Sequence, residues 1–389
     1  MMKTRRSALL ILAIALLPST AFADAGTPLM WASMLHLVFG NAIIGLFEGM
    51  LLARIFKCSA WRSVLALIPA NYASAWVGML LFSGVFKPLP DITKIPDITI
   101  ENIRFWFCSF VVFSFLVTLV IEYPFFWYVM RFQERRLVRA AKATALVNAI
   151  SYVFLFGWYW MASGTSMMTQ VQVVSPGSLT PRDEYALFFI STDGSQILQT
   201  DLDGQHRSVL CAVVAPHRDD RLFARQNPET GYDLFVHLDS KDRDKVREDL
   251  IAANFSDLAP VDWRISQGHS EKTEGTWFNL GPAPSLASKS DWEFSTGFWP
   301  VEGITAENKK EEESLGFSLE TPFAAWIIRN ATQLEGDIVV FQLGENQICK
   351  LDPASKRIAL IARGKGPIVA KLKNPPTPAP KLLNSPAAE

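Results

Sequence analysis

Four long apolar runs constrain the fold of this chain more than any other feature. They cover about 31–53, 63–86, 105–130 and 143–161. An α-helix rises about 1.5 Å per residue, so each run is long enough to cross a hydrocarbon core of about 30 Å. The sequence therefore predicts an all-α, four-helix transmembrane domain over residues 24–164.

Each apolar run also carries polar residues that lipid does not solvate. The pairs are Asn41 with Glu48, Asn71 with Ser74, Thr118 with Glu122, and Asn148 with Ser151. Residues three, four or seven positions apart lie on one helix face. Each helix is thus expected to have one polar stripe, and such stripes normally face other helices.

The depth of these residues follows from the basic residues at one end of each run. Glu48 and Asn148 lie six residues from Arg54 and Lys142, and Asn71 and Glu122 lie nine residues from Arg62 and Arg131. These separations correspond to roughly 9–14 Å along a helix. Glu48, Asn71, Glu122 and Asn148 should therefore form one intramembrane polar layer. Two interpretations stay open: a layer that fixes helix register, which is the commoner case, or a proton or cation path.

The N-terminus has the pattern of a signal peptide over residues 1–23. Lys3, Arg5 and Arg6 precede the apolar run Ala8–Leu17, and Ala21-Phe22-Ala23 provides a cleavage motif. Cleavage after such a motif places the mature N-terminus outside the cytoplasm.

Loop charges predict the same orientation. The loops after the first and third runs contain Arg54, Lys57, Arg62, Arg131, Arg135, Arg136, Arg139 and Lys142. Basic loops are retained in the cytoplasm. We therefore expect a multi-pass protein of a bacterial-type plasma (inner) membrane, with the N-terminus and the C-terminal half extracytoplasmic.

The C-terminal half differs in composition. Residues 1–161 carry 14 Lys and Arg against 7 Asp and Glu, and the remainder carries 23 against 31, a net charge of −8. An acidic region of this kind is unsuited to nucleic acid. Residues 176–373 are expected to form an extracytoplasmic β-domain, and the proline-rich tail 374–389 is expected to be disordered.

The β-domain is predicted to be propeller-like. Strand-like runs at Tyr185–Ser191, Gln196–Leu202 and Arg207–Val213 are separated by Gly-containing turns. Related segments end at Asp201, Asp239 and Asp352, and their spacings approximate multiples of 38 residues, near the length of a propeller blade. A β-sandwich is the alternative. One helix is predicted at Asp239–Asn254, from charged residues with Val246, Leu250 and Ile251 at helical spacing.

Known catalytic motifs are missing from the sequence. No C-x-x-C, G-x-S-x-G, phosphate loop or G-x-G-x-x-G occurs, and the histidines lack metal-ligand spacing. The sequence thus predicts no catalytic, metal or cofactor-binding residues and favours a protein that is not an enzyme. Cys211 and Cys349 share the oxidising side of the membrane, where they either form a disulfide or remain free.

Two functions agree with these observations. The first is binding or sensing by the extracytoplasmic domain, with a membrane or envelope protein as partner, because no cytoplasmic domain is evident. The second is a small transporter or a proton or cation relay that uses Glu48 and Glu122. Four helices are few for a transporter, so this second function implies a homo-oligomer in the lipid bilayer.

Overall fold

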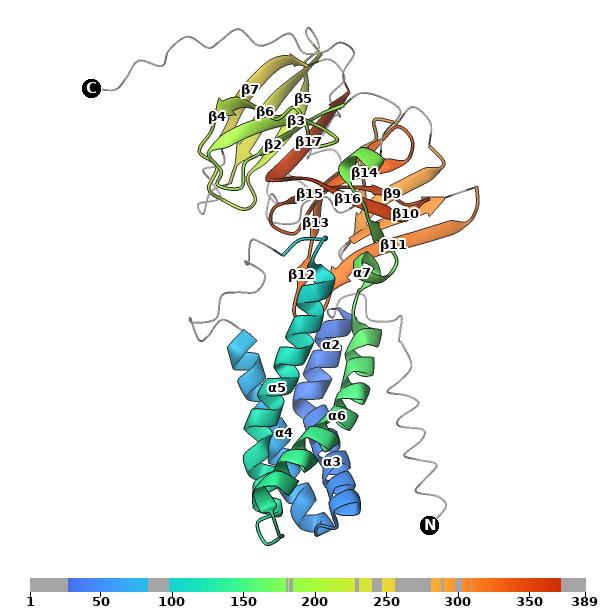
Figure 1. The fold of residues 1–389 in the computed structure, drawn as a ribbon. Helices are drawn as coiled ribbons and strands as arrows, with labels where there is room; N and C mark the ends of the chain where they lie inside the picture. Colours follow the sequence, from blue (N-terminus) through green and yellow to red (C-terminus); the bar gives the residue numbers. More distant parts are fainter. Residues whose placement is uncertain are drawn as a thin grey trace, which may run out of the picture.

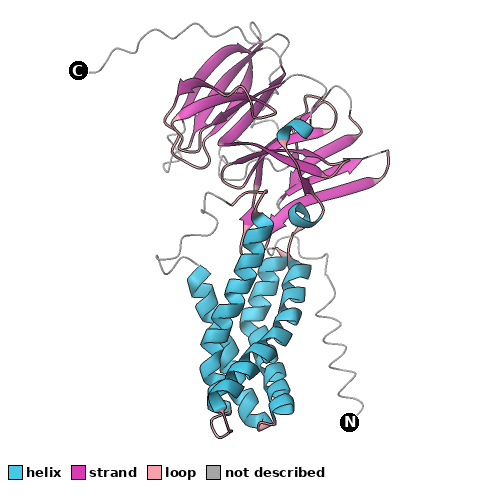
Figure 2. Ribbon diagram, in the orientation of Figure 1, coloured by secondary structure: helices cyan, strands magenta, loops and turns pink. Residues whose placement is uncertain are grey.

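A computed structural model of the chain shows a four-helix region with long apolar helices, followed by a mostly-β region of several sheets (Figures 1 and 2). It describes residues 27–82, 98–179, 181, 185–227, 231–239, 247–255, 281–287, 290–297, 303–308 and 310–371. The expected signal peptide and C-terminal tail lie outside these ranges.

The helical region contains four helices that are long and apolar enough to cross a membrane. The first combines α2 (Pro28–Leu35), the π-helical turn η1 (His36–Gly40) and α3 (Asn41–Phe56). The others are α4 (Ala60–Phe82), α5 (Ile103–Val129) and α6 (Arg136–Ala162). They overlap the four apolar runs of the sequence.

The start of α2 follows from its local sequence. The Thr27 hydroxyl accepts a hydrogen bond from the Met30 backbone N–H, and Pro28 occupies the first helical position. The first N–H groups of a helix lack partners within the helix, and proline has no N–H to satisfy. This sequence therefore favours helix initiation at Pro28.

Close packing is concentrated at the distal end of the bundle, the end away from the β region. Leu52, Leu67, Phe126 and Met130 are fully buried there. Helices α3 and α4 approach closely there because Gly49 lacks a side chain: a Cβ at this position would lie 2.6 Å from the Val64 Cα. Small residues allow helix backbones to pack in this way.

The β region contains four sheets, within which neighbouring strands are antiparallel except for β1 and β16. Sheet I has the order β17-β2-β3-β4, with β2 Tyr185–Ile190, β3 Gln196–Asp201, β4 Ser208–Ala212 and β17 Lys365–Lys371. Sheet II has β5 Arg221–Asn227, β6 Gly231–Leu238 and β7 Arg247–Phe255. Strands β2, β3 and β4 lie where the sequence predicts them.

The other two sheets complete the region. Sheet III has the order β12-β11-β10-β9-β8, with β8 Gly281–Pro282, β9 Trp292–Gly297, β10 Gly303–Asn308, β11 Glu313–Glu320 and β12 Ala325–Trp326. Sheet IV has the order β1-β16-β15-β14-β13, with β1 Gln172–Val173, β13 Ile328–Leu334, β14 Ile338–Leu343, β15 Gln347–Asp352 and β16 Arg357–Arg363. A short helix α7 (Ser166–Thr169) and the 3-10 turn η3 (Pro176–Ser178) flank β1.

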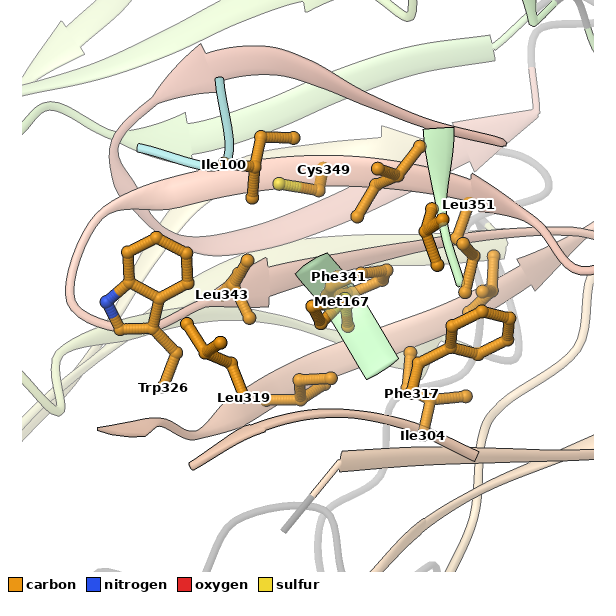
Figure 3. Packing of buried hydrophobic residues seen from close by; sticks show 14 of the residues in the cluster. Ile100, Met167, Ile304, Phe317, Leu319, Trp326, Phe341, Leu343, Cys349 and Leu351 are labelled. Atoms are coloured by element: carbon orange, nitrogen blue, oxygen red, sulfur yellow. The ribbon is translucent and has the colours of Figure 1, made fainter. Parts of the chain in front are cut away.

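Three hydrophobic cores hold the sheets together. Sheets I and II share a core around Phe188 and Leu234, and the opposite face of sheet I packs on sheet IV around Phe189 and Val340. Sheet IV packs in turn on sheet III, where Phe317 and Phe341 belong to the largest core (Figure 3). Sheets I and IV therefore bury apolar side chains on both faces.

Two segments next to the long apolar helices complete that largest core. Ile98 and Ile100 precede α5, and Met167 and Met168 lie in α7, and all four are buried in the core between sheets III and IV (Figure 3). The Ile100 backbone N–H also donates to Gln347 Oε1 at 2.8 Å. The β region is thus anchored to the helices by more than a single linker.

The predicted helix at Asp239–Asn254 is wrong where the structure describes it. Residues Arg247–Phe255 form strand β7, which pairs antiparallel with β6 and places Leu250 opposite Phe235. The helical spacing of Val246, Leu250 and Ile251 was misleading, because pairing with a neighbouring strand overrides local propensity. Residues 240–246 lie outside the described ranges.

Candidate functional site

The first half of the polar layer is centred on Glu48 in α3. Its carboxylate accepts a hydrogen bond from Asn71 Nδ2 in α4 at 2.6 Å and another from Ser151 Oγ in α6 at 2.5 Å. Glu48 has no exposed surface. A buried carboxyl group requires such partners, because burial removes the hydrogen bonds that it makes to water. Glu48 therefore links three helices.

The second half is centred on Glu122 in α5. Its carboxylate accepts from Ser74 Oγ in α4 at 2.7 Å and from Asn148 Nδ2 in α6 at 3.1 Å. Glu122 also has no exposed surface. The structure thus brings together the four residues that the sequence places in one layer, and it adds Ser74 and Ser151 as donors. All four helices take part.

Apolar side chains close the bundle on the distal side of this layer. Leu52 lies one turn beyond Glu48, Phe126 one turn beyond Glu122, and Leu67 one turn from Asn71, and each is completely buried. Val147 and Ala143 fill the same level from α6. This plug of packed side chains separates the polar layer from the basic loops.

A chamber of about 430 Å³ lies on the other side of the layer, toward the β region. Thr118, Tyr152, Leu155 and Tyr159 belong to its wall, and Glu48 and Glu122 lie at its floor. Several wall residues are only half-buried, in contrast to the distal side chains. The bundle is therefore solid in its distal half and hollow in its other half.

Two further polar pairs cross the chamber wall. Tyr152 OH and Thr118 Oγ1 lie 2.7 Å apart, and His36 Nδ1 lies 2.7 Å from Tyr159 OH. His36 begins the π-helical turn η1, a local widening of the helix that is frequent at functional sites. His36 and Tyr159 could not be singled out from the sequence, because they are 123 residues apart and match no motif.

The β region supplies the roof of the chamber. Pro322 and Phe323, in the turn between β11 and β12, line its upper end. The Phe323 ring contacts Phe107 and Phe110 of α5, with centroid distances of 5.9 and 5.7 Å. Aromatic pairs in this range are mutually stabilising. The roof therefore packs directly on α5.

Glu320 fixes this turn on the helical region. Its backbone N–H and carbonyl pair with Gly164, just after α6. Its carboxyl group accepts a hydrogen bond from Thr27 Oγ1, the N-cap of α2, at 2.5 Å. Burial raises the pKa of Glu320 above its ordinary value, and the Thr27 hydrogen bond opposes this rise.

The lining of the chamber limits its chemistry. The described residues that line it include no Lys or Arg, and the imidazole of His36 among them is paired with Tyr159. Within the described ranges, no three His, Cys, Asp or Glu side chains gather as they would around a metal ion. The described walls of the chamber are thus apolar and aromatic with hydroxyl groups, and the floor holds the two buried glutamates.

The structure does not bring Cys211 and Cys349 together. Both are free thiols; Cys349 lies in the core between sheets III and IV, whereas Cys211 packs against the core between sheets I and II. Burial raises the pKa of both thiols.

Comparison with known proteins leaves the chain without a family. No family model matches it, and no curated protein matches it. Among solved structures it is similar to the crystal structure of TolB from Acinetobacter baumannii, with 11% identity and a TM-score of 0.16 over 58% of this chain and 47% of that chain. The chain therefore spans less than half the length of that structure.

Proposed function

We propose that this protein is a multi-pass plasma-membrane protein that binds or senses a ligand. Occupancy of its binding site is then signalled to a membrane or envelope protein partner. In this proposal the four helices cross the bilayer, and the N-terminus and β region are extracytoplasmic. The signal-peptide pattern and the eight basic residues in the two distal loops support this orientation.

The observation that carries the proposal is the roof of the chamber. Phe323, from the β region, lines the same cavity as Thr118 and Tyr152 of the bundle. A ligand that fills the chamber must contact or displace this side chain. Occupancy would then shift the contact between the bundle and the β region, and a ligand can shift such an equilibrium by its difference in affinity for the two states.

A proton or cation relay is the second candidate, favoured by the two buried carboxylates. It requires a path from the polar layer to the distal end of the bundle. Leu52, Leu67 and Phe126 fill that path without exposed surface. A chamber that is blind on one side favours binding over conduction.

We infer that the β region is propeller-like. Its sheets follow one another along the chain as β2–β4, β5–β7, β8–β12 and β13–β16. Strand β17 returns to pair with β2, so the last strand completes the first sheet, a closure that ties the chain ends together. The shared cores between sheets II and I, I and IV, and IV and III support consecutive blades. A β-sandwich is the alternative.

The test is purification of the full chain in mild detergent from its native host, after cross-linking in the membrane. We expect a stoichiometric membrane or envelope protein to accompany it, and we expect this partner to be lost when the β region is removed. A lone homo-oligomer that moves protons or cations in liposomes would contradict the proposal and favour the relay.

A further inference from the structure

The accessible surface of the chamber points to an uncharged ligand. Glu48 and Glu122 are both 0% exposed, because Asn71, Ser74, Asn148 and Ser151 cover them. No Lys or Arg is among the described residues that line the chamber. An anionic ligand would find no cation among these residues, so its charge would be buried unpaired, which is costly. A cationic ligand would reach Glu48 or Glu122 only by displacing the donors that cover them.

The hydrogen-bonding groups that a ligand can reach lie near the floor. Thr118 and Tyr152, together with Ser114, line the chamber and are half-buried. Thr118 and Ser114 lie one and two turns from Glu122 on the same face of α5. A hydroxyl both donates and accepts, so these groups suit a ligand head that carries hydroxyl or carbonyl oxygens.

The roof end of the chamber is aromatic. The Phe107 ring lies 6.4 Å from Trp160 and 5.9 Å from Phe323, and Phe156 stacks on Trp160 at 5.6 Å. Aromatic surfaces of this kind accommodate an apolar chain. The chamber is thus polar at its floor and apolar toward its roof.

We propose that the chamber binds a neutral amphipathic lipid, such as a monoacylglycerol. Its hydroxylated head hydrogen-bonds to Thr118 and Tyr152, and its chain lies against Phe107, Trp160 and Phe323. A volume of about 430 Å³ falls within the usual range for small-molecule sites. This inference rests on the proposed function, in which the chamber is the binding site.

The experiment measures thermal unfolding of the purified full chain with three additives that share one chain: monolauroylglycerol, dodecylammonium and laurate. We expect monolauroylglycerol alone to raise the Tm in a saturable manner. Thr118→Val removes the hydroxyl and keeps the side-chain shape, and should weaken the apparent affinity about 2- to 10-fold, the loss of one hydrogen bond. Tyr152→Phe is a second variant with the same expectation.

Ser109→Ala is the matched control, because Ser109 is a half-buried residue of α5 that is not among the described residues lining the chamber. This variant should respond like the wild type. Equal stabilisation by all three additives, a larger effect of dodecylammonium or laurate, or an unchanged response in both chamber variants would overturn the inference. None of these results bears on whether a partner co-purifies with the chain. Failure of the lipid-binding inference is therefore distinguishable from failure of the proposed function.

Discussion

Thr27 and Glu320, 293 residues apart in the chain, are joined by a hydrogen bond of 2.5 Å between the Thr27 hydroxyl and the Glu320 carboxyl group. Thr27 is also the N-cap of α2, and Glu320 begins the turn that roofs the chamber. One contact therefore connects the start of the bundle to the part of the β region that covers the site.

This contact should depend on pH. Because burial raises the pKa of Glu320, the folded state binds its proton more tightly than the unfolded state. The resulting stabilisation is fully present below the ordinary pKa of 4.5 and is lost as pH rises through the higher folded value. We expect the Tm of the full chain to fall over this window, and Glu320→Gln to flatten the profile.

The control for this profile is Glu313→Gln, which changes an exposed carboxylate on the same strand, β11. It should leave the pH dependence of the Tm unchanged. A wild-type Tm that instead rises across the window, with the same slope in Glu320→Gln, would show that Glu320 does not link pH to the docking of the roof.

The polar layer predicts different effects for the two glutamates. Asn71 Nδ2 also donates to Leu67 O, and Ser151 Oγ also lies within hydrogen-bond distance of Asn148 O, so both keep acceptors if Glu48 is replaced. In the described chain, Asn148 Nδ2 donates to Glu122. Glu122→Leu should therefore destabilise the bundle by about 1–3 kcal/mol, the cost of an unsatisfied buried group, and more than Glu48→Leu.

The matched variants Glu48→Gln and Glu122→Gln keep an uncharged hydrogen-bonding shape. If the layer is structural, both should leave the free energy of unfolding in detergent within about 0.5 kcal/mol of the wild-type value. Equal destabilisation by Leu and Gln at position 122 would count against a structural role for these hydrogen bonds.

The stability of the β region should depend on residues that precede the predicted domain boundary at residue 176. Met167, Met168 and Val171 are 5%, 5% and 2% exposed, and each buried side chain contributes about 1.5–3 kcal/mol. A fragment of residues 165–373 should therefore unfold at a Tm more than about 10 °C above that of residues 176–373, measured by circular dichroism. Gln170→Ala, an exposed position in the longer fragment, is the control. Equal Tm values would show that α7 and β1 contribute little.

The proposed orientation in the membrane predicts the pattern of fusion reporters. Reporters after Lys57 and Lys142 should be active in the cytoplasm, because the loops there are basic. Reporters after Lys94 and Gly177 should be active outside the cytoplasm. Cytoplasmic activity at Gly177 would contradict the proposed compartment of the β region.

Much of the helical region follows from local patterns. Runs of apolar residues predict the helices, and the three- and four-residue spacing of Asn71 with Ser74 and of Thr118 with Glu122 predicts which faces meet. Desolvation then requires the carboxylates to turn toward the available amides and hydroxyls. Both steps depend only on residues within one helix and on the cost of burying charge.

The roof and its attachment could not be predicted in the same way. Phe323 contacts Phe107 although the two residues are more than 200 positions apart in the chain. Ile100, in the segment between α4 and α5, donates a hydrogen bond to Gln347 of β15. Periodicity within a segment says nothing of such pairings. The same limitation explains strand β7, whose charged sequence resembles a surface helix but whose backbone pairs with β6.

The most direct test of the account is proton flux into liposomes that contain the purified full chain and an internal pH-sensitive dye, under an applied membrane potential. A blind chamber closed by Leu52, Leu67 and Phe126 predicts a flux equal to that of protein-free liposomes. A flux above that level, abolished by Glu48→Gln or Glu122→Gln in protein that still folds, would contradict the account and assign the polar layer to a relay.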